Sequence, residues 1–355
     1  MTDRLSTLLH AEGAALDIPP VPDGIVAAGR REVHRRRART ALVGAVAVLL
    51  VAVGASVAVG HWLGGPDSVQ PADQLAYEQN GAWARGDEVH VGNHVVVVPG
   101  TQTLQYSSAG VVVAAKDGYV LVRPDGRVED LDLGVISDPF RLPAVGTEPT
   151  TANLAYVRAV GADRAQLVVH DLGTGEETAV TPAYRTTQPD PVSWLSGDLV
   201  ASFRNGHGVI LDWRTGEKSP TPRTGWWQSA DVSVDYDTDG TWTLRTFDGD
   251  QLLTVTSPDP ASTYGTLSPD GRYFAVSDAE PRFTVYDLAS GRSTVFDDRA
   301  LPDYGWTPDG HLIGSSTTTG GEVEVCDPAT RSCEGTGTTA GGQLTVVAGE
   351  PGATP

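Results

Sequence analysis

The stretch Leu267-Ser-Pro-Asp-Gly-Arg-Tyr-Phe-Ala-Val-Ser-Asp278 joins a tight turn to a strand-like run, and the chain repeats this combination. A second strong copy, Trp306-Thr-Pro-Asp-Gly-His311, precedes the apolar run Leu312-Ile-Gly-Ser-Ser316. The Asp-Gly pair suits a tight turn, because glycine adopts positive φ without steric cost. One short unit that recurs at a fixed period indicates a repeat architecture.

Weaker copies of this turn precede other strand-like runs. They are Trp83-Ala-Arg-Gly-Asp87, Tyr106-Ser-Ser-Ala-Gly110, Trp194-Leu-Ser-Gly-Asp198 and Tyr236-Asp-Thr-Asp-Gly240. A second turn of the type Asp-x-x-Thr-Gly recurs at Asp171, Asp212, Asp287 and Asp327. Successive copies of it lie 41, 75 and 40 residues apart, so one copy is missing or degenerate near Phe247-Asp-Gly-Asp250.

Two turns and several alternating strands in about 40 residues predict a four-stranded unit. Such units repeated around a ring form a β-propeller, so we expect an all-β propeller over residues 75–348. Seven turn positions, near residues 86, 110, 153, 197, 240, 271 and 310, predict seven blades. Spacings of 24 and 31 residues at two of them leave six or eight blades open. We expect Gln343–Val347 to close the ring against the first blade.

The turns Ser268–Gly271 and Thr307–Gly310 resemble those of the TolB-like and WD40-like propeller superfamily. The resemblance covers roughly residues 75–348 and is weak in the first two units. The Gly-His and Trp-Asp dipeptides of WD40 repeats are not present at matching places. The resemblance implies that the loops between blades emerge on the same face as the loops between second and third strands.

A 23-residue segment without acidic or basic residues, Ala41–Leu63, follows six arginines between Arg30 and Arg39. At 1.5 Å per residue it is long enough to cross the hydrocarbon core of about 30 Å. The basic flank predicts a cytoplasmic amino terminus. We therefore expect a transmembrane helix over 41–63. The alternative is a cleaved signal peptide, because Ala58 and Gly60 offer a small-x-small cleavage pattern, although the 40 residues before the apolar run are many for one.

The anchor defines the remaining parts of the chain. We expect a cytoplasmic tail over 1–40, a linker over 64–74 and a disordered tail over 349–355. Leucines at near-helical spacing, a proline break, an arginine run and an anchor are similar to the layout of bacterial envelope proteins associated with alternative sigma factors. The zinc-binding pattern of such proteins is absent, because no cysteine precedes residue 326.

The charge is distributed unevenly. Residues 1–63 hold seven arginines and five acidic residues, whereas the rest holds 18 basic and 40 acidic residues. So acidic an exterior domain gives no basis for binding nucleic acid or an anionic membrane surface. The two lysines, Lys116 and Lys218, among many arginines suggest a high-GC bacterial genome.

Both cysteines, Cys326 and Cys333, flank a turn-forming stretch in the expected exterior domain. Strand residues that face each other across a hairpin lie within disulfide distance. An extracytoplasmic compartment permits oxidation, so we expect a Cys326–Cys333 bridge.

Three short motifs carry weak chemical signals. Asp235, Asp237 and Asp239 match the first half of a calcium loop, but position 12 is Thr246, and a solvated hairpin explains the match as well. Arg85-Gly86-Asp87 coincides with the first blade turn, which explains it. The eight histidines are scattered and no nucleophile or phosphate-loop motif appears, so we expect neither a cofactor nor an enzyme.

Arginine and tryptophan recur in the loops that the resemblance places on one face. These candidate binding residues are Arg141, Arg185, Arg204, Arg223, Trp226, Trp227, Arg282 and Arg299. Acids such as Glu176, Glu217 and Asp270 fall on the opposite face. Arginine and tryptophan are frequent in binding hot spots, and arginine binds carboxylates through two hydrogen bonds, so we expect an acidic or anionic partner. The alternative is scattered arginines that balance nearby acids.

These observations favour a membrane-anchored extracytoplasmic propeller that binds or scaffolds a protein or ligand in the cell envelope. One alternative is a transmembrane regulator that signals through residues 1–40 to a sigma-factor-like partner. Another is an envelope enzyme that uses the central channel, which would need carboxylates or histidines that converge there.

Overall fold

The computed structural model divides the chain into two compact units, Met1–Ser68 and Val69–Pro355, and every residue described below belongs to the second. The structure describes residues 71–133, 145–161, 163–185, 192–204, 207–220, 227–229, 232–237, 239–246, 249–257, 264–279, 282–300, 304–316, 321–339 and 344–346. The expected membrane helix over 41–63, the tail over 1–40 and the tail over 349–355 lie outside these residues. Within them, none of the helices has the length and apolar character that a membrane span needs.

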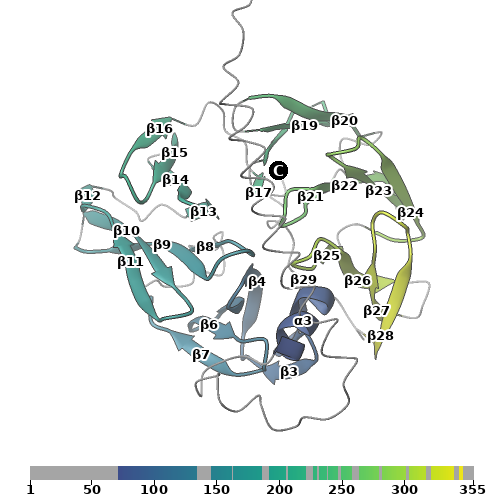
Figure 1. Cartoon of the computed structure of the whole chain (residues 1–355), viewed down its shortest axis with the longest axis horizontal. Helices are drawn as coiled ribbons and strands as arrows, with labels where there is room; N and C mark the ends of the chain where they lie inside the picture. The colour runs from purple at the N-terminus through teal and green to yellow at the C-terminus, as the bar shows by residue number, and fades with distance from the viewer. Residues whose placement is uncertain are drawn as a thin grey trace, which may run out of the picture. The chain divides into compact units, whose positions relative to one another are not determined.

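The described residues form seven antiparallel sheets around a centre (Figure 1). Blades 1 to 3 contain β29 (Thr345–Val346), β1 (Ala82–Arg85), β2 (Glu88–Val91) and β3 (His94–Val97); β4 (Thr101–Ser107), β5 (Gly110–Ala115), β6 (Gly118–Val122) and β7 (Val128–Leu131); and β8 (Val145–Thr147), β9 (Asn153–Ala159), β10 (Arg164–Asp171), β11 (Glu176–Val180) and β12 (Tyr184–Arg185). Blades 4 and 5 contain β13 (Val192–Ser196), β14 (Leu199–Arg204), β15 (His207–Asp212) and β16 (Lys218–Pro220); and β17 (Trp227–Ser229), β18 (Val232–Tyr236), β19 (Thr241–Thr246) and β20 (Gln251–Thr256). Blades 6 and 7 contain β21 (Gly265–Leu267), β22 (Tyr273–Ala279), β23 (Arg282–Asp287) and β24 (Ser293–Asp297); and β25 (Tyr304–Trp306), β26 (Leu312–Ser316), β27 (Glu322–Cys326) and β28 (Cys333–Thr339). The predicted seven-bladed propeller is therefore confirmed.

The ring closes through the last strand of the chain. β29 is the innermost strand of blade 1, where Val346 lies opposite Trp83 and Thr345 lies opposite Ala84. The predicted closing strand is thus confirmed at residues 345 and 346. Blade 1 takes its first strand from the carboxyl end and its other three from the start of the domain.

Two of the seven turns counted in the sequence belong to a different position in the blade. Gly110, Gly197, Gly271 and Gly310 lie in turns between the first and second strands of their blades, whereas Gly86 and Gly240 lie between the second and third. This difference accounts for the irregular spacings of 24 and 31 residues. The sequence could not reveal it, because a glycine with positive φ serves any tight hairpin, and φ is 58° at Gly86 and 70° at Gly271.

The degenerate turn predicted near residue 247 is present as the β19–β20 connection. The Gly249 nitrogen donates a hydrogen bond to the Thr246 carbonyl at 2.9 Å, and the Thr246 nitrogen donates to the Asp250 carbonyl at 2.9 Å. The turn therefore forms without the threonine-glycine pair of the other copies.

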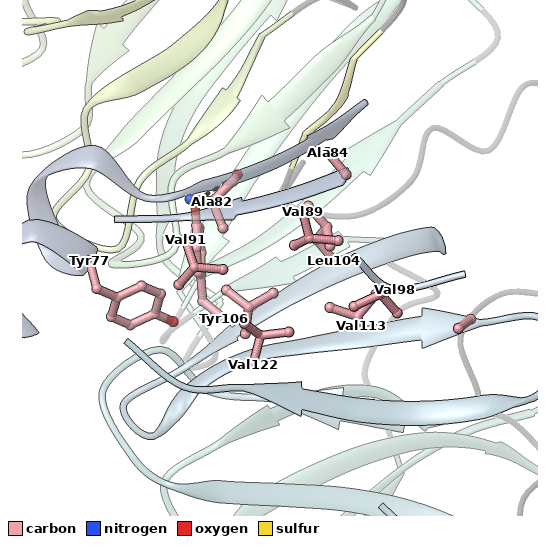
Figure 2. Close-up of a cluster of buried hydrophobic side chains, with 12 residues drawn as sticks. Tyr77, Ala82, Ala84, Val89, Val91, Val98, Leu104, Tyr106, Val113 and Val122 are labelled. Carbon is pink, nitrogen blue, oxygen red and sulfur yellow. Dashed lines mark hydrogen bonds between the residues drawn. The ribbon is translucent and has the colours of Figure 1, made fainter. Parts of the chain in front are cut away.

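Apolar side chains between neighbouring sheets hold the blades together. Between blades 1 and 2, valines and alanines of β1, β2 and β5 meet Leu104 and Tyr106 of β4, as Figure 2 shows. Helix α3 (Pro71–Asn80) contributes Tyr77, whose hydroxyl donates to the Ser107 and Gly110 carbonyls at 2.8 and 3.0 Å. A buried valine or leucine contributes about 1.5–3 kcal/mol, so these interfaces account for much of the stability.

The seam between blades 7 and 1 has a much smaller core. Among the described residues, twelve buried residues form the cluster between blades 1 and 2, whereas three, Trp83, Ile313 and Val323, form the cluster at the seam. Val325 and Leu344 pack against those three and are only partly buried. The seam is consequently a place where the described blades leave space between them.

Candidate binding cleft at the seam of the ring

A cleft of about 600 Å³ lies at the seam between blades 7 and 1. One wall comes from blade 1 and the end of α3, and the other comes from blade 7. The lining residues are Gln79, Asn80, Trp83, His90, Gly92, Asn93, His94, Val95, Asp309, His311, Val325, Asp327, Ser332, Glu334, Gly335, Thr336 and Thr338. We refer to this site as the seam cleft.

Strand pairing in blade 1 builds the first wall. Trp83 lies opposite His90, and His90 lies opposite Val95, so the three side chains share one face of the sheet. The Trp83 and His90 rings are stacked, with centroids 3.5 Å apart and planes 10° apart. Burial lowers the pKa of His90, which keeps the stacked imidazole neutral at pH 7.

The outer strand of blade 1 extends this wall with exposed apolar side chains. Val95 is 57% exposed and Val97 is 68% exposed. Both lie on β3, whose alternation places them on the same face of the strand. This part of the sheet therefore offers apolar surface that no described residue covers.

Blade 7 supplies three carboxylates to the second wall, two of them, Asp309 and Asp327, from turns. Asp309 Oδ1 lies 2.8 Å from Nδ1 of His311. Asp327 accepts hydrogen bonds from the Ala329 nitrogen at 2.7 Å and from the Thr330 hydroxyl at 2.9 Å. Partial burial would raise the pKa of Asp327, but these hydrogen bonds and nearby His311 lower it, so Asp327 is ionised at neutral pH.

The third carboxylate, Glu334, lies on β28 and is exposed. No described residue donates a hydrogen bond to its side chain. The described lining contains no lysine or arginine, so the cleft is acidic when its histidines are neutral. A site with this charge favours a cation.

Helix α3 is tied to the blade 1 side of the cleft. His94 Nε2 lies 3.1 Å from Oδ1 of Asp73, and the Asn80 amide donates to Oδ1 of Asn93 at 3.2 Å. The helix that follows the amino-terminal unit thus helps to shape the cleft.

The sequence did not predict the seam cleft. His90 and His94 are close in sequence, but His311 lies far along the chain from them, and the histidines were interpreted as scattered. The alternation around His90 and His94 indicates strands, but no local signal places His311 beside them. Only closure of the ring brings the two sets together.

The structure places the predicted arginine and tryptophan residues unevenly. Arg141, Arg223 and Trp226 lie outside the described residues, and only the backbone of Arg204 and Trp227 is described. Arg185 and Arg282 are exposed, at the end of β12 and the start of β23.

Arg299 belongs to a buried network. Its Nε and Nη2 donate to the two carboxylate oxygens of Glu324 at 2.5 and 3.2 Å, and the Tyr304 hydroxyl also donates to Glu324. Glu324 is 4% exposed and Tyr304 is fully buried. The hydrogen bond to Glu324 raises the pKa of Arg299. The Arg299 guanidinium is therefore charged and engaged in an ion pair with Glu324.

The turns at Gly86 and Gly240 add acidic residues to the face on which the arginine and tryptophan residues were predicted to lie. Asp87, Asp237 and Asp239 lie in or beside turns between second and third strands, and these turns share a face with the loops between blades. The surface around Arg185 and Arg282 therefore contains acidic residues as well.

The calcium candidates form a hairpin turn. Asp237 Oδ1 accepts hydrogen bonds from the Asp239 nitrogen at 3.0 Å and the Thr241 nitrogen at 2.9 Å. Asp235 is within β18, opposite Thr243. These three carboxylates do not gather their oxygens as a metal site would in the part of the chain that the structure describes.

One group of three potential metal ligands lies close together among the described residues, and it contains Glu324, Cys326 and Cys333. The two cysteines form the predicted disulfide, with a Cα–Cα distance of 4.0 Å. Disulfide sulfurs are not thiolates and do not bind metal as thiolates do. Glu324 is already paired with Arg299, so this group is structural.

The described innermost strands carry few ionisable side chains. β4, β8, β13, β17, β21, β25 and β29 contain no Asp, Glu, His, Lys, Arg or Cys. Their ionisable side chains are those of Tyr106 and Tyr304, and both are buried.

A smaller cleft of about 370 Å³ lies between blades 2 and 3. Its lining includes Arg123, which donates from Nε and Nη2 to Glu129 at 2.5 and 2.7 Å. Because Arg123 neutralises the Glu129 carboxylate, the lining of this cleft has a smaller net negative charge than that of the seam cleft.

Comparisons with known proteins found similar solved structures of low sequence identity. No protein-family model matches the sequence, and no curated protein matches it. Among solved structures, the chain is similar to Kluyvelomyces marxianus Hsv2, with a TM-score of 0.41, 13% identity, and coverage of 64% of this chain and 72% of that one. It is also similar to the Myceliophteria thermophila Cps50 (Swd1) β-propeller domain, with a TM-score of 0.44, 11% identity, and coverage of 68% and 87%.

Proposed function

We propose that this protein is a single-pass membrane protein whose propeller binds or scaffolds a partner outside the cytoplasm. The observation that carries the proposal is a closed seven-bladed ring with a lined cleft on its surface. A rigid ring with an open site suits binding. The function of a propeller has to be inferred from its binding site, because the fold itself serves many functions.

Two features support the placement in the membrane. The apolar segment over 41–63 with its arginine flank has the length and charge asymmetry of a single span. The Cys326–Cys333 disulfide is of a kind that persists in oxidising compartments, which agrees with an extracytoplasmic propeller.

Topology can be tested with single cysteines and a membrane-impermeant maleimide in intact cells. Because the native pair is oxidised, an introduced cysteine is the reactive thiol. Asp117→Cys lies in the exposed β5–β6 turn and should be labelled, whereas Thr7→Cys in the expected cytoplasmic tail should be labelled only after lysis. Labelling of both in intact cells would contradict the proposed orientation.

Partner binding can be tested by cross-linking in the cells that make the protein. Photo-reactive residues in the propeller and in residues 1–40 would be used separately, and the captured proteins identified. Envelope proteins captured by the propeller would support a binding module, and no capture by the propeller would contradict it.

The same experiment addresses signalling through the tail and the predicted acidic partner. Capture of a transcription regulator by residues 1–40, together with altered transcription when residues 1–24 are deleted, would establish the regulator alternative.

Arg185→Glu combined with Arg282→Glu should weaken capture if the partner is acidic and uses the predicted face. Unchanged capture in that double variant would exclude this part of the face.

A further inference from the structure

We propose that the seam cleft binds a positively charged segment of a partner protein, with a lysine or arginine side chain held by the blade 7 carboxylates opposite the Trp83–His90 stack. This inference rests on the proposed binding function and specifies its site and the chemistry of its ligand. It does not depend on the membrane anchor.

The first argument is the packing of the seam. Of the described residues, blades 1 and 2 bury a cluster of twelve between them, but the seam buries three and has a cleft beside them. The closure strand β29 pairs with β1 through two residues on each strand and is the innermost strand of blade 1. The outer parts of the two blades are left to face the cleft.

The second argument is charge. Asp309, Asp327 and Glu334 line the cleft, and its described lining contains no lysine or arginine. Glu334 has no described hydrogen-bond partner for its side chain, and only one of the Asp309 oxygens is engaged by described residues. Carboxylates with unused acceptor capacity suit the fork of an arginine or the ammonium of a lysine.

The third argument is the blade 1 wall. Val95 lines the cleft and is largely exposed, and Trp83 and His90 form a stacked aromatic pair beside it. The side chains of lysine and arginine have long apolar stems that pack along such surface while the charged end reaches a carboxylate. The combination of apolar wall and acidic wall therefore matches a basic side chain better than a bare metal ion.

The fourth argument is size. A volume of about 600 Å³ lies within the range of ligand sites and exceeds what one side chain fills. The cleft can accept a basic side chain together with its neighbours in a peptide. We therefore assign the ligand to a protein segment rather than to a small cation.

The test uses the purified full-length chain and two fluorescein-labelled peptides. The first contains two arginines separated by serine and flanked by glycine and serine. The second replaces both arginines with citrulline, which keeps the shape and removes the charge. Binding is measured by fluorescence anisotropy at low and at high ionic strength.

The variants separate the cleft from the general acidity of the domain. Glu334→Gln removes one cleft charge, and Glu334→Arg reverses it. Asn93→Arg, in the exposed β2–β3 turn, places a cation on the opposite wall. Glu217→Arg makes the same charge reversal in an exposed turn of blade 4, outside the cleft, and is the matched control.

We expect the arginine peptide to bind and the citrulline peptide to bind at least about tenfold more weakly. Glu334→Gln should weaken binding about threefold, and Glu334→Arg or Asn93→Arg about tenfold, whereas Glu217→Arg should leave it unchanged. High salt should weaken binding, because the charges are partly exposed.

Three results would overturn the inference. They are equal binding of the two peptides, an effect of Glu217→Arg as large as that of Glu334→Arg, and no binding at low ionic strength. If the propeller captures a partner in cells and the cleft variants capture it equally well, the binding function stands and the seam cleft is not its site.

Discussion

Trp83, the second residue of β1, lies directly opposite Val346 of β29, so the beginning and the end of the domain share one sheet. The Trp83 side chain is 4% exposed and packs in the seam cluster with Ile313 and Val323 of blade 7. One residue thus joins strand pairing within blade 1 to packing between blades 1 and 7. The seam cleft lies beside this junction.

Removal of the closing strand should destabilise the whole ring. A chain that ends after residue 343 loses β29 and the contact of Leu344 with the seam cluster. We expect its free energy of unfolding to fall by about 3 kcal/mol, since apolar burial and ladder hydrogen bonds are lost together. Chemical denaturation measures this, with a chain that ends after residue 348 as the control. Equal stability of the two truncations would contradict the role of β29.

The buried ion pair between Arg299 and Glu324 should be structural. Arg299→Gln leaves the Glu324 carboxylate, which is 4% exposed, without its charged partner. We expect a loss of about 3 kcal/mol in unfolding free energy. Arg299→Met combined with Glu324→Gln should recover much of that loss, because no buried charge is left unpaired. If Arg299 instead serves only a partner, Arg299→Gln will unfold at the same denaturant concentration as the wild type.

The disulfide should stabilise blade 7. Cys326 is fully buried in the cluster between blades 6 and 7, and it lies opposite Cys333 across β27 and β28. A bridge that closes so short a loop contributes about 2 kcal/mol in the chain-entropy account. The double variant Cys326→Ala, Cys333→Ala should show that loss in denaturant unfolding. A reductant should lower the stability of the wild type and leave the double variant unchanged; a response from both would point to a different cause.

Stability should fall on mild acidification partly through His90. Burial lowers the pKa of His90 in the folded protein, whereas the unfolded chain has an ordinary histidine pKa of about 6.5. As pH falls below that value, the unfolded chain binds a proton before the folded protein does, so the stability present at higher pH is progressively lost. Thermal unfolding between neutral and mildly acidic pH measures this dependence.

His90→Phe is the matching variant for that experiment. Phenylalanine keeps an aromatic ring against Trp83 but cannot titrate, so its stability should change less with pH than that of the wild type. Comparison of the two curves removes the contribution of the other histidines. Parallel curves would show that His90 does not contribute to the pH dependence.

The sequence predicted that a unit repeats, but it did not predict which two strands of a blade each turn joins. Asp-Gly and Thr-Gly turns between alternating runs identified blades, because a hairpin needs particular residues at its turn. Gly86 and Gly240 were nevertheless counted as copies of the same turn as Gly271, although they lie between the second and third strands of their blades. The turn chemistry is the same at both positions, and only pairing with β29 and β17 shows which strand is innermost.

The predicted arginine and tryptophan binding residues show a similar limit of prediction from sequence. Loop position selected Arg185 and Arg282, which are exposed, but it also selected Arg299, whose partner Glu324 is 25 residues further along the chain. Whether an arginine contacts solvent or a buried carboxylate depends on contacts between strands. Such contacts leave no local pattern in the sequence.

The sequence by itself determined the propeller, the closing strand and the disulfide, because each depends on turn residues or on spacing along the chain. It predicted seven blades but left six or eight open, and the strand pairing of the folded ring decided the number. Tertiary structure alone decided the seam cleft. Asp309 and His311 come to lie near His90 and His94 only because β29 joins blade 1 and brings it against blade 7. Packing between distant segments is set by how the ring closes, and the charge and shape of the cleft follow from that closure.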